Sequence, residues 1–337
     1  MKKHLYISFF LLVFTSCEKI FIADDPIDDP VSNFDHLWTR LDEQYAYFEY
    51  KNIDWDSIYN VYRAKVSEDI QNDSLFRVMS NMLFELRDGH VNLMTAFDIS
   101  RNWEWYLDRP QNFDFSILER NYLGDNYRIT GSFINTVFDS VGYIRYASFS
   151  DAIYNNQIDA LLKAFSNYKG LVIDVRDNGG GYVSNAELLA SKFIDEEQVV
   201  GYTSTKNGTE HDNFTIDKPI ILEPSMDDDM YSFNKPVVIL TNRSCYSSTT
   251  MFATYMSGLD HVTIVGDTTG GGGGLPITYQ LPNGWRVRYS STITMDKHKF
   301  NVEHGVPADI VVTQTSLDLA NGIDPILVRG VQEIISK

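Results

Sequence analysis

The stretch Lys235–Met256, KPVVILTNRSCYSSTTMFATYM, decides the fold class of this 337-residue chain. Its apolar run from Pro236 to Leu240 predicts a buried strand, and the polar residues Thr241–Arg243 predict a tight turn. The Ser/Thr-rich segment that follows leads into an amphipathic helix. A strand, a turn and a helix in succession indicate an α/β protein, with Ser247 and Ser248 at the corner between strand and helix.

Ser247 lies where this helix is expected to begin, and a hydroxyl there allows two interpretations. The free N–H groups of a first helical turn and the helix dipole stabilise an oxyanion, so Ser247 can be a nucleophile. Serine is also a favoured N-cap residue, because its side chain satisfies those same N–H groups without any chemistry. The stretch alone favours the N-cap, and the rest of the sequence has to decide.

Two further apolar runs predict strands of the same sheet. Val141–Tyr146 and Leu171–Val175 flank a helical pattern over Tyr154–Asn167, which implies crossover connections and parallel strand pairs. Functional groups gather at the carboxyl ends of such strands. Glycines 179–181 follow the second run, and their N–H groups could bind an oxyanion or form a simple tight turn. Neither they nor Gly270–Gly274 show the Gly-Lys-Ser/Thr ending of a phosphate-binding loop.

The composition indicates a folded globular protein and limits its partners. Apolar residues make up 43% of the chain and aromatic residues 13%, enough for a substantial core. The chain has 28 Lys and Arg against 46 Asp and Glu, a formal charge of −18. Because nucleic-acid binding relies on basic residues, this balance argues against a nucleic-acid partner. The seven histidines show no metal-ligand spacing such as HExxH, so we expect no metal and no cofactor.

The first residues have the layout of an export signal. Two lysines precede an apolar core over Leu5–Phe14, which is too short to span a bilayer. Small residues then precede Cys17, which resembles the lipobox of bacterial lipoproteins; an ordinary signal peptide is the alternative. The lipobox resemblance implies a signal peptide over residues 1–16, acylation of Cys17 and an acidic tether over residues 17–32. We therefore expect an exported lipoprotein on the periplasmic or cell-surface face of a membrane.

Three helical segments between residues 33 and 95 predict an N-terminal helical subdomain. Apolar residues recur there at helical spacing in three runs, and the second and third runs open at Asp54 and Asp73. We expect the third helix to stop at Gly89, which places His90 on the following turn. A single histidine in a turn is usually incidental, so this position alone does not make His90 catalytic.

Four motifs resemble, in their order, the tail-specific (C-terminal processing) and tricorn-core family of serine peptidases. They are LRDGHVNL from Leu86, LVIDVRDNGGG from Leu171, the Ser247 corner and GVPADIVV from Gly305. The resemblance covers about residues 33–312. It implies a ClpP/crotonase-like α/β core over residues 96–337, preceded by the helical subdomain. The stretch between His90 and Val141 is too short for the PDZ domain that many relatives insert there.

The resemblance also indicates which residue activates the serine. Tail-specific members use a Ser–Lys pair, and Gly272 stands where their lysine would be. The tricorn-like branch uses a histidine after the N-terminal helices and a glutamate before the GVxPD-like segment, and His90 and Glu303 occupy these places. It therefore implies Ser247 as nucleophile, His90 as general base and Glu303 as the carboxylate that orients the imidazole. The family's SAxE helix start reads Ser247–Thr250 here, without the acidic residue.

The chemistry so implied is acyl transfer. A base takes the serine proton, and the oxyanion would lie between the N–H of Ser248 and the N–H of Gly179 or Gly180. Ser248 would be the nucleophile instead if the turn were one residue longer. Glu303 could also be an exposed strand-end carboxylate, with His304 or Asp309 more important locally.

We expect an exported, lipid-anchored serine endopeptidase that cleaves unfolded or C-terminal peptide segments. Two other functions stay open. One is a catalytically inactive peptidase-fold protein that binds a peptide or an apolar ligand, and the other is a crotonase-type acyl enzyme. Export disfavours the crotonase-type enzyme, because it separates the protein from acyl-CoA.

Overall fold

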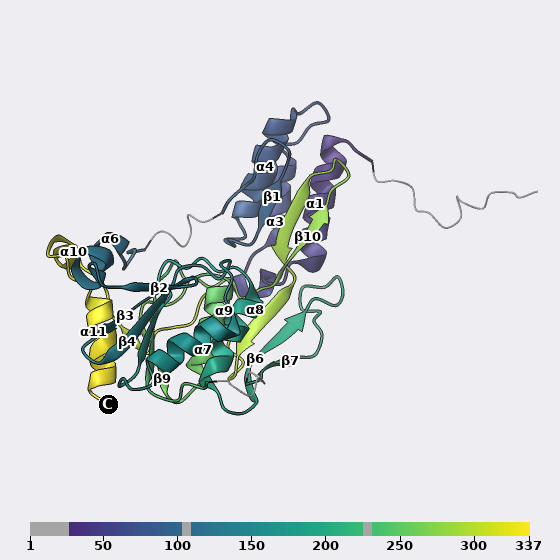
Figure 1. The fold of residues 1–337 in the computed structure, drawn as a ribbon. Helices are drawn as coiled ribbons and strands as arrows, with labels where there is room; N and C mark the ends of the chain where they lie inside the picture. Colours follow the sequence, from purple (N-terminus) through teal and green to yellow (C-terminus); the bar gives the residue numbers. More distant parts are fainter. Residues whose placement is uncertain (1–26, 103–108, 225–230) are drawn as a thin grey trace, which may run out of the picture.

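A seven-stranded sheet forms the centre of the core, in the strand order β13-β9-β8-β5-β4-β3-β2 (Figure 1). Its strands are β2 (Arg128–Thr130), β3 (Phe133–Phe138), β4 (Val141–Tyr146), β5 (Leu171–Asp174), β8 (Val237–Thr241), β9 (Val262–Gly266) and β13 (Ile310–Val311). The pairs from β4 to β13 are parallel, whereas β3 and β2 add to the edge in antiparallel fashion. Every residue of β5 and β8 is buried, as expected for central parallel strands with both faces covered.

Helices cover both faces of this sheet. One apolar cluster packs helices of one face against it: α7 (Asn155–Ala164), α8 (Val183–Ala190), the 3-10 turn η3 (Ser191–Phe193) and α9 (Ser248–Ser257). A second cluster packs α11 (Pro325–Ile335) and the π-helical turn η2 (Leu118–Leu123) against the opposite face. The short helices α6 (Phe115–Ile117) and α10 (Ser316–Ala320) lie near α11. These two apolar interfaces hold the sheet rigid, so the carboxyl ends of its strands are fixed relative to one another.

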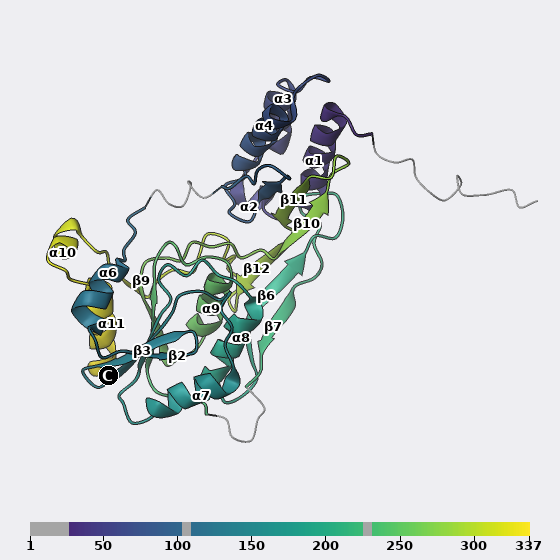
Figure 2. The same cartoon turned by 45° about the horizontal axis from the view of Figure 1, so that its top comes forward.

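The N-terminal subdomain projects from the core. Its helices are α1 (Pro30–Gln44), α2 (Phe48–Lys51), α3 (Trp55–Arg63) and α4 (Asn72–Phe84). They pack around a three-stranded sheet of β1 (Asn92–Met94), β11 (Arg286–Ser290) and β10 (Pro276–Gln280). Two strands from the C-terminal half of the chain therefore complete the apolar core of this subdomain. A third sheet, β12 (Thr292–Asp296), β6 (Gln198–Thr205) and β7 (Lys218–Leu222), lies beside α8 and α9 (Figure 2).

The computed structural model describes residues 27–102, 109–224 and 231–337. The expected signal peptide, Cys17 and most of the expected tether lie outside these ranges. Within the ranges, no helix is both long enough and apolar enough to cross a bilayer. The α/β core preceded by helices, with no PDZ domain among the described residues, confirms the fold class predicted from the sequence.

Two helix boundaries differ from the expected ones. Helix α1 begins at Pro30, because the Asp29 carboxylate caps it by accepting the Ser32 N–H at 2.9 Å. The last residues of the expected tether therefore belong to the folded subdomain. Helix α4 ends at Phe84, five residues before Gly89, and Arg87 rather than Gly89 has a positive φ, of 47°. His90 consequently follows an irregular turn and not a glycine cap.

Candidate active site

Ser247 lies at the junction between β8 and α9, at the carboxyl end of a central parallel strand. Its backbone has φ 57° and ψ −121°, a conformation that non-glycine residues rarely adopt and that commonly marks functional sites. It stands at the N-cap position of α9, yet its side chain makes no capping hydrogen bond. Its N–H donates to Gly271 O at 2.9 Å, and its carbonyl accepts from Met251 N at 3.0 Å. The backbone therefore fixes the corner and leaves the hydroxyl available.

The hydroxyl of Ser247 meets the imidazole of His90. Ser247 Oγ lies 3.0 Å from His90 Nε2, a hydrogen-bond distance. The two residues come from different parts of the molecule, because His90 follows α4 in the N-terminal subdomain and Ser247 belongs to the core. The contact thus joins the two residues that the sequence motifs singled out as a nucleophile and base.

Asp88 holds the turn that carries His90. Its Oδ1 accepts the backbone N–H of His90 at 2.8 Å and lies 3.4 Å from the hydroxyl of Tyr246. Its Oδ2 accepts the Tyr45 hydroxyl at 2.9 Å. The carboxylate is fully buried, and these donors compensate its loss of water.

A buried lysine connects Asp88 to Glu303. Lys51 Nζ lies 2.7 Å from Glu303 Oε1 and 3.6 Å from Asp88 Oδ2. It also donates to the carbonyls of Leu86 at 3.3 Å and Arg87 at 3.2 Å, so it ties α2 to the turn before His90. The sequence analysis did not identify Lys51, because no local pattern marks a lysine that is buried only when distant elements meet.

Glu303 makes no direct contact with His90 and is linked to it through Lys51 and Asp88. Its Oε2 accepts Gly273 N–H at 3.1 Å, and its other oxygen pairs with Lys51. His90 Nδ1 is buried and has no hydrogen-bond partner among the described residues. The direct Glu303–imidazole contact implied by the family resemblance is therefore absent from this arrangement, and Asp88 is the carboxylate whose charge acts on His90.

Burial sets the protonation states of these groups. Burial lowers the pKa of His90 to about 4, with the Asp88 charge opposing and the Arg288 and Lys51 charges adding to the shift. Burial raises the pKa of Glu303 to about 7, with Lys51 opposing and Asp88 adding. Burial alone would raise the pKa of Asp88, but Lys51 and His90 hold it below its usual range. At neutral pH the imidazole is therefore uncharged and able to accept a proton.

The expected oxyanion donors lie around Ser247, and they are not equivalent. The N–H of Ser248 belongs to the first residue of α9, where no preceding helical turn offers an acceptor. The N–H of Gly179 donates to no residue that the structure describes, and the space beside its Cα is open. The N–H of Gly180 is engaged, because it donates to Asn178 Oδ1 at 3.0 Å. Ser248 and Gly179 are thus better placed as donors than Gly180.

The glycine turn is held against Ser247 by Asn178 and by a buried ion network. Asn178 Nδ2 donates to Tyr146 O at 2.9 Å, and Asn178 O accepts Tyr246 N–H at 3.2 Å. Arg176, fully buried, pairs with Asp174 at 2.6 Å and with Asp324 at 2.8 Å. These contacts anchor both ends of the turn that follows β5.

A cavity of about 710 Å³ opens over the two residues. It is lined by Gly89, His90, Asn92, Ile99, Arg101, Asp177, Gly179, Gly181, Ser244, Tyr246, Ser247 and Arg288. This volume lies within the range of ligand-binding pockets. Because Ser247, His90 and Gly179 share it, a bound group could reach the hydroxyl and the donor N–H at once.

Ser248, the alternative nucleophile, is engaged elsewhere, and neither the neighbouring thiol nor position 272 is suited to the reaction. Ser248 Oγ donates to Gly181 O at 2.7 Å and is buried. Burial raises the pKa of the Cys245 thiol to about 12. A side chain at Gly272 would be strained at φ 73° and would lie 2.4 Å from Tyr246 Cζ, so no lysine could replace His90 from there.

The other residues considered next to Glu303 have different surroundings. Asp309 Oδ2 accepts Ile264 N–H at 2.8 Å, and the His304 ring packs against Tyr50 with 4.8 Å between centroids. Among the described residues, no group of three or more His, Cys, Asp or Glu side chains could hold a metal ion.

Two family profiles match this chain. Residues 140–312 match peptidase family S41, and residues 28–84 match the C1 domain of tricorn protease. The chain is similar to the carboxyl-terminal-processing protease of Synechocystis, with 28% identity over 192 residues, which is 55% of this chain and 41% of the relative. It is also similar to carboxy-terminal processing protease CtpB of Bacillus subtilis, with 27% identity over 150 residues, 44% of this chain and 29% of the relative. It thus spans less than half the length of these two curated relatives.

Solved structures share the fold over most of the chain. A candidate peptidase of Parabacteroides merdae is 40% identical, has a TM-score of 0.86, and matches 91% of this chain and 97% of its own. The tricorn protease matches 91% of this chain with a TM-score of 0.57 and 36% of its own chain; at 16% identity this likeness shows the fold alone. The profiles and the Parabacteroides structure confirm the family predicted from the four sequence motifs.

Proposed function

Because the chain belongs to peptidase family S41, we propose that it is a serine peptidase in which Ser247 attacks the peptide carbonyl and His90 acts as general base. The observation that carries this proposal is the 3.0 Å contact between Ser247 Oγ and His90 Nε2, two residues that line the same cavity. The strained backbone of Ser247 supports it, since a plain N-cap serine needs no such conformation.

In the first step, the neutral imidazole of His90 takes the proton of Ser247 as Oγ bonds to the substrate carbonyl carbon. The imidazolium then gives that proton to the leaving amine as the peptide C–N bond breaks, which leaves an acyl ester on Ser247. A water molecule then gives a proton to His90 as its oxygen bonds to the ester carbonyl carbon. The bond between that carbon and Ser247 Oγ breaks, the carboxylic acid product leaves, and His90 returns the proton to Ser247 Oγ. The low pKa of His90 keeps the base unprotonated at neutral pH, and the nearby Asp88 charge favours the imidazolium that forms when it takes the proton.

The oxyanion that forms in both steps would accept hydrogen bonds from the N–H groups of Ser248 and Gly179. Neither group donates within the described structure, so no internal bond has to break when the oxyanion forms. Loss of one such donor typically costs about 10²–10³-fold in turnover. Gly180 has a different role, because its backbone packs directly against Ser247 and its N–H fixes the turn.

Asp88, Lys51 and Glu303 are positioning residues in this mechanism. The Asp88 carboxylate holds the His90 backbone and stabilises the transient imidazolium, since its charge favours protonated His90. Lys51 holds Asp88 and the neighbouring carbonyls, and Glu303 holds Lys51. Glu303 therefore supports the base through two intermediates.

The proposal extends to unfolded or C-terminal peptide segments as substrates and to an exported, lipid-anchored protein. The names of the curated relatives, carboxyl-terminal-processing proteases, support the substrate class. The sequence before residue 27, with its apolar run and Cys17, supports the anchor.

Proteolysis of an unfolded protein tests the proposed function. Purified chain, incubated with reduced and alkylated casein, should release peptides that mass spectrometry detects, and Ser247→Ala should release none above background. Saturable binding of the same substrate without cleavage would support the alternative, an inactive binding protein. Cleavage that persists in Ser247→Ala would exclude Ser247 as the nucleophile.

A further inference from the structure

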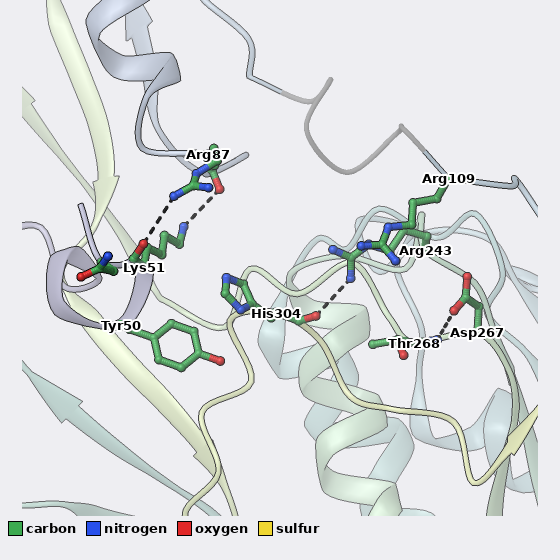
Figure 3. A pocket seen from close by; sticks show the side chains of 9 residues that line it. Tyr50, Lys51, Arg87, Arg109, Arg243, Asp267, Thr268 and His304 are labelled. Carbon is green, nitrogen blue, oxygen red and sulfur yellow. Dashed lines mark hydrogen bonds between the residues drawn. The ribbon is translucent and has the colours of Figure 1, made fainter. Parts of the chain in front are cut away.

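A second cavity lies between the N-terminal subdomain and the core, and the proposed reaction does not use it. It holds about 510 Å³, and its lining includes Lys51, Arg87, Arg109, Arg243, Asp267 and His304. Figure 3 shows Arg87 on the subdomain side, Arg109 and Arg243 across the cavity, and His304 between them. The cavity therefore receives guanidinium groups from both halves of the molecule.

This cavity is lined mainly by positive charges, although the chain as a whole is strongly negative. The protein has a net charge of −18, yet three arginines line this one space; Lys51 also lines it but is already paired with Glu303 and Asp88. Arg87 and Arg109 make no ion pair with any residue that the structure describes. Asp267, the single acidic residue of the lining, already accepts hydrogen bonds from Thr268 N at 2.7 Å and Asn112 Nδ2 at 3.3 Å.

The pKa of His304 reflects the positive charges around the cavity. Its pKa is lowered first by burial and then by the charges of Lys51, Arg243 and Arg87. The imidazole therefore adds no charge at neutral pH, while the arginines keep theirs. A half-enclosed space lined by guanidinium groups favours ligands with planar or tetrahedral oxyanions, which arginine binds through paired hydrogen bonds.

The cavity touches both segments that carry the proposed catalytic pair. Arg87 stands three residues before His90 in the same turn, and Arg243 stands four residues before Ser247 in the same loop. Arg243 also ties its loop to neighbouring segments, because Nη1 donates to Thr269 O at 2.8 Å and to His304 O at 3.0 Å. Arg87 and Arg243 carry like charges on the two segments and repel each other. An anion bound between them would attract both and so hold the two segments together.

We propose that this cavity binds an anionic ligand with carboxylate or phosphate-type oxygens, and that the bound anion stabilises the arrangement in which His90 faces Ser247. The binding rests on the cavity alone, whereas its effect on the reaction rests on the proposed peptidase function. The anion has two possible sources with the same chemistry: a free small anion, or a carboxylate of the bound peptide.

Binding is tested with phosphate and citrate on the purified chain, at ionic strength held constant with sodium chloride. Each anion should bind saturably in calorimetry and raise the unfolding temperature of the wild type. Arg87→Gln/Arg109→Gln should lose both effects; Arg243 stays intact because it holds two carbonyls. The control is Arg77→Gln, on the exposed face of α4 and paired only with Asp73 at 3.8 Å, which should behave like the wild type. Equal temperature rises in all three proteins would mean a general salt effect and overturn the site.

Coupling to the catalytic pair is tested by the rate at which a fluorophosphonate labels Ser247. Saturating phosphate should raise this rate in the wild type by about fivefold or more, the lower end of typical coupling between two sites, and not in Arg87→Gln/Arg109→Gln. An unchanged rate in wild type with bound phosphate would overturn the coupling. If Ser247 is never labelled while phosphate still binds, the peptidase proposal fails and the anion site stands.

Peptide substrates distinguish the two sources. If the peptide supplies the carboxylate, phosphate should raise the KM of a peptide with a free C-terminus or an acidic side chain, and leave the KM of its amidated, neutral counterpart unchanged. If a free anion is the ligand, phosphate should raise kcat/KM for both peptides alike. If phosphate binds yet changes neither parameter for either peptide, the proposed effect on the reaction is wrong.

Discussion

His90 Nε2 lies 3.0 Å from Ser247 Oγ although 157 positions separate the two residues in the chain. The first belongs to a turn of the N-terminal subdomain, and the second to the loop between a central strand and a helix of the core. The candidate active site is therefore assembled at the interface of the two parts, and contacts across that interface control its geometry.

The pH dependence of the reaction should reflect the low pKa of His90. With this pKa near 4, the base is neutral at pH 7, and kcat/KM should fall about tenfold per pH unit only below pH 4. Arg288→Gln removes a positive charge that lowers this pKa, so the acid limb should move to higher pH. A limb near pH 6.5 in the wild type, the usual histidine value, would contradict the buried neutral imidazole.

The low pKa of His90 also predicts how the stability of the fold depends on pH. Its pKa falls from about 6.5 in the unfolded chain to about 4 in the folded one, so the unfolded chain binds more protons between these values. The contribution of neutral His90 to the free energy of unfolding is fully present above pH 6.5 and is lost as the pH falls toward 4. Thermal unfolding from pH 7 to 4 should therefore show a smaller loss of stability in His90→Gln than in the wild type.

Lys51 should matter more for stability than Glu303. Lys51→Met leaves the buried carboxylates of Asp88 and Glu303 without their shared cation, and breaking such a buried pair typically costs about 3–5 kcal/mol. Glu303→Gln keeps Lys51 and its contacts with Asp88 and the two carbonyls, so we expect a smaller loss. Denaturant unfolding at pH 8 measures both variants. A larger loss in Glu303→Gln would contradict the central position of Lys51 in the network.

Two neighbouring glycines should tolerate alanine very differently. A Cβ at Gly180 would lie 2.8 Å from Ser247 Cβ and 2.6 Å from Tyr246 O, and its φ of 100° disfavours alanine. A Cβ at Gly179 would meet no atom within 4 Å. We expect Gly180→Ala to reduce kcat by a hundredfold or more, on the order of losing an oxyanion donor, and Gly179→Ala to keep most activity. Equal effects would argue against the close packing of Gly180 on Ser247.

Much of the fold could be predicted from the sequence, because the signals are local. The apolar runs over 141–146, 171–175 and 236–240 became β4, β5 and β8 within one residue at either end. The packing of β10 and β11 against the N-terminal helices was not predictable in this way, since Trp285 packs against Phe76 and Val287 pairs with Leu93, both in the distant N-terminal part of the chain.

The residues of the candidate site were likewise predictable only where a local motif marks them. His90 and Ser247 stood in recognisable motifs, and the structure brings them together. Asp88 belongs to the same motif as His90, but its bonds to Tyr45 and Lys51 form only when the subdomain folds. Glu303 was expected beside His90 because the family pattern gives order along the chain and not side-chain geometry. Lys51 carries no local signal at all.

The site that reacts with a fluorophosphonate probe tests the central claim most directly, because the probe bonds only to an activated nucleophile. Intact mass and peptide mapping of the labelled protein should place a single adduct on Ser247, with labelling abolished in Ser247→Ala and slowed by orders of magnitude in His90→Ala. An adduct on Ser248, or labelling that survives in Ser247→Ala, would contradict the proposed catalytic pair.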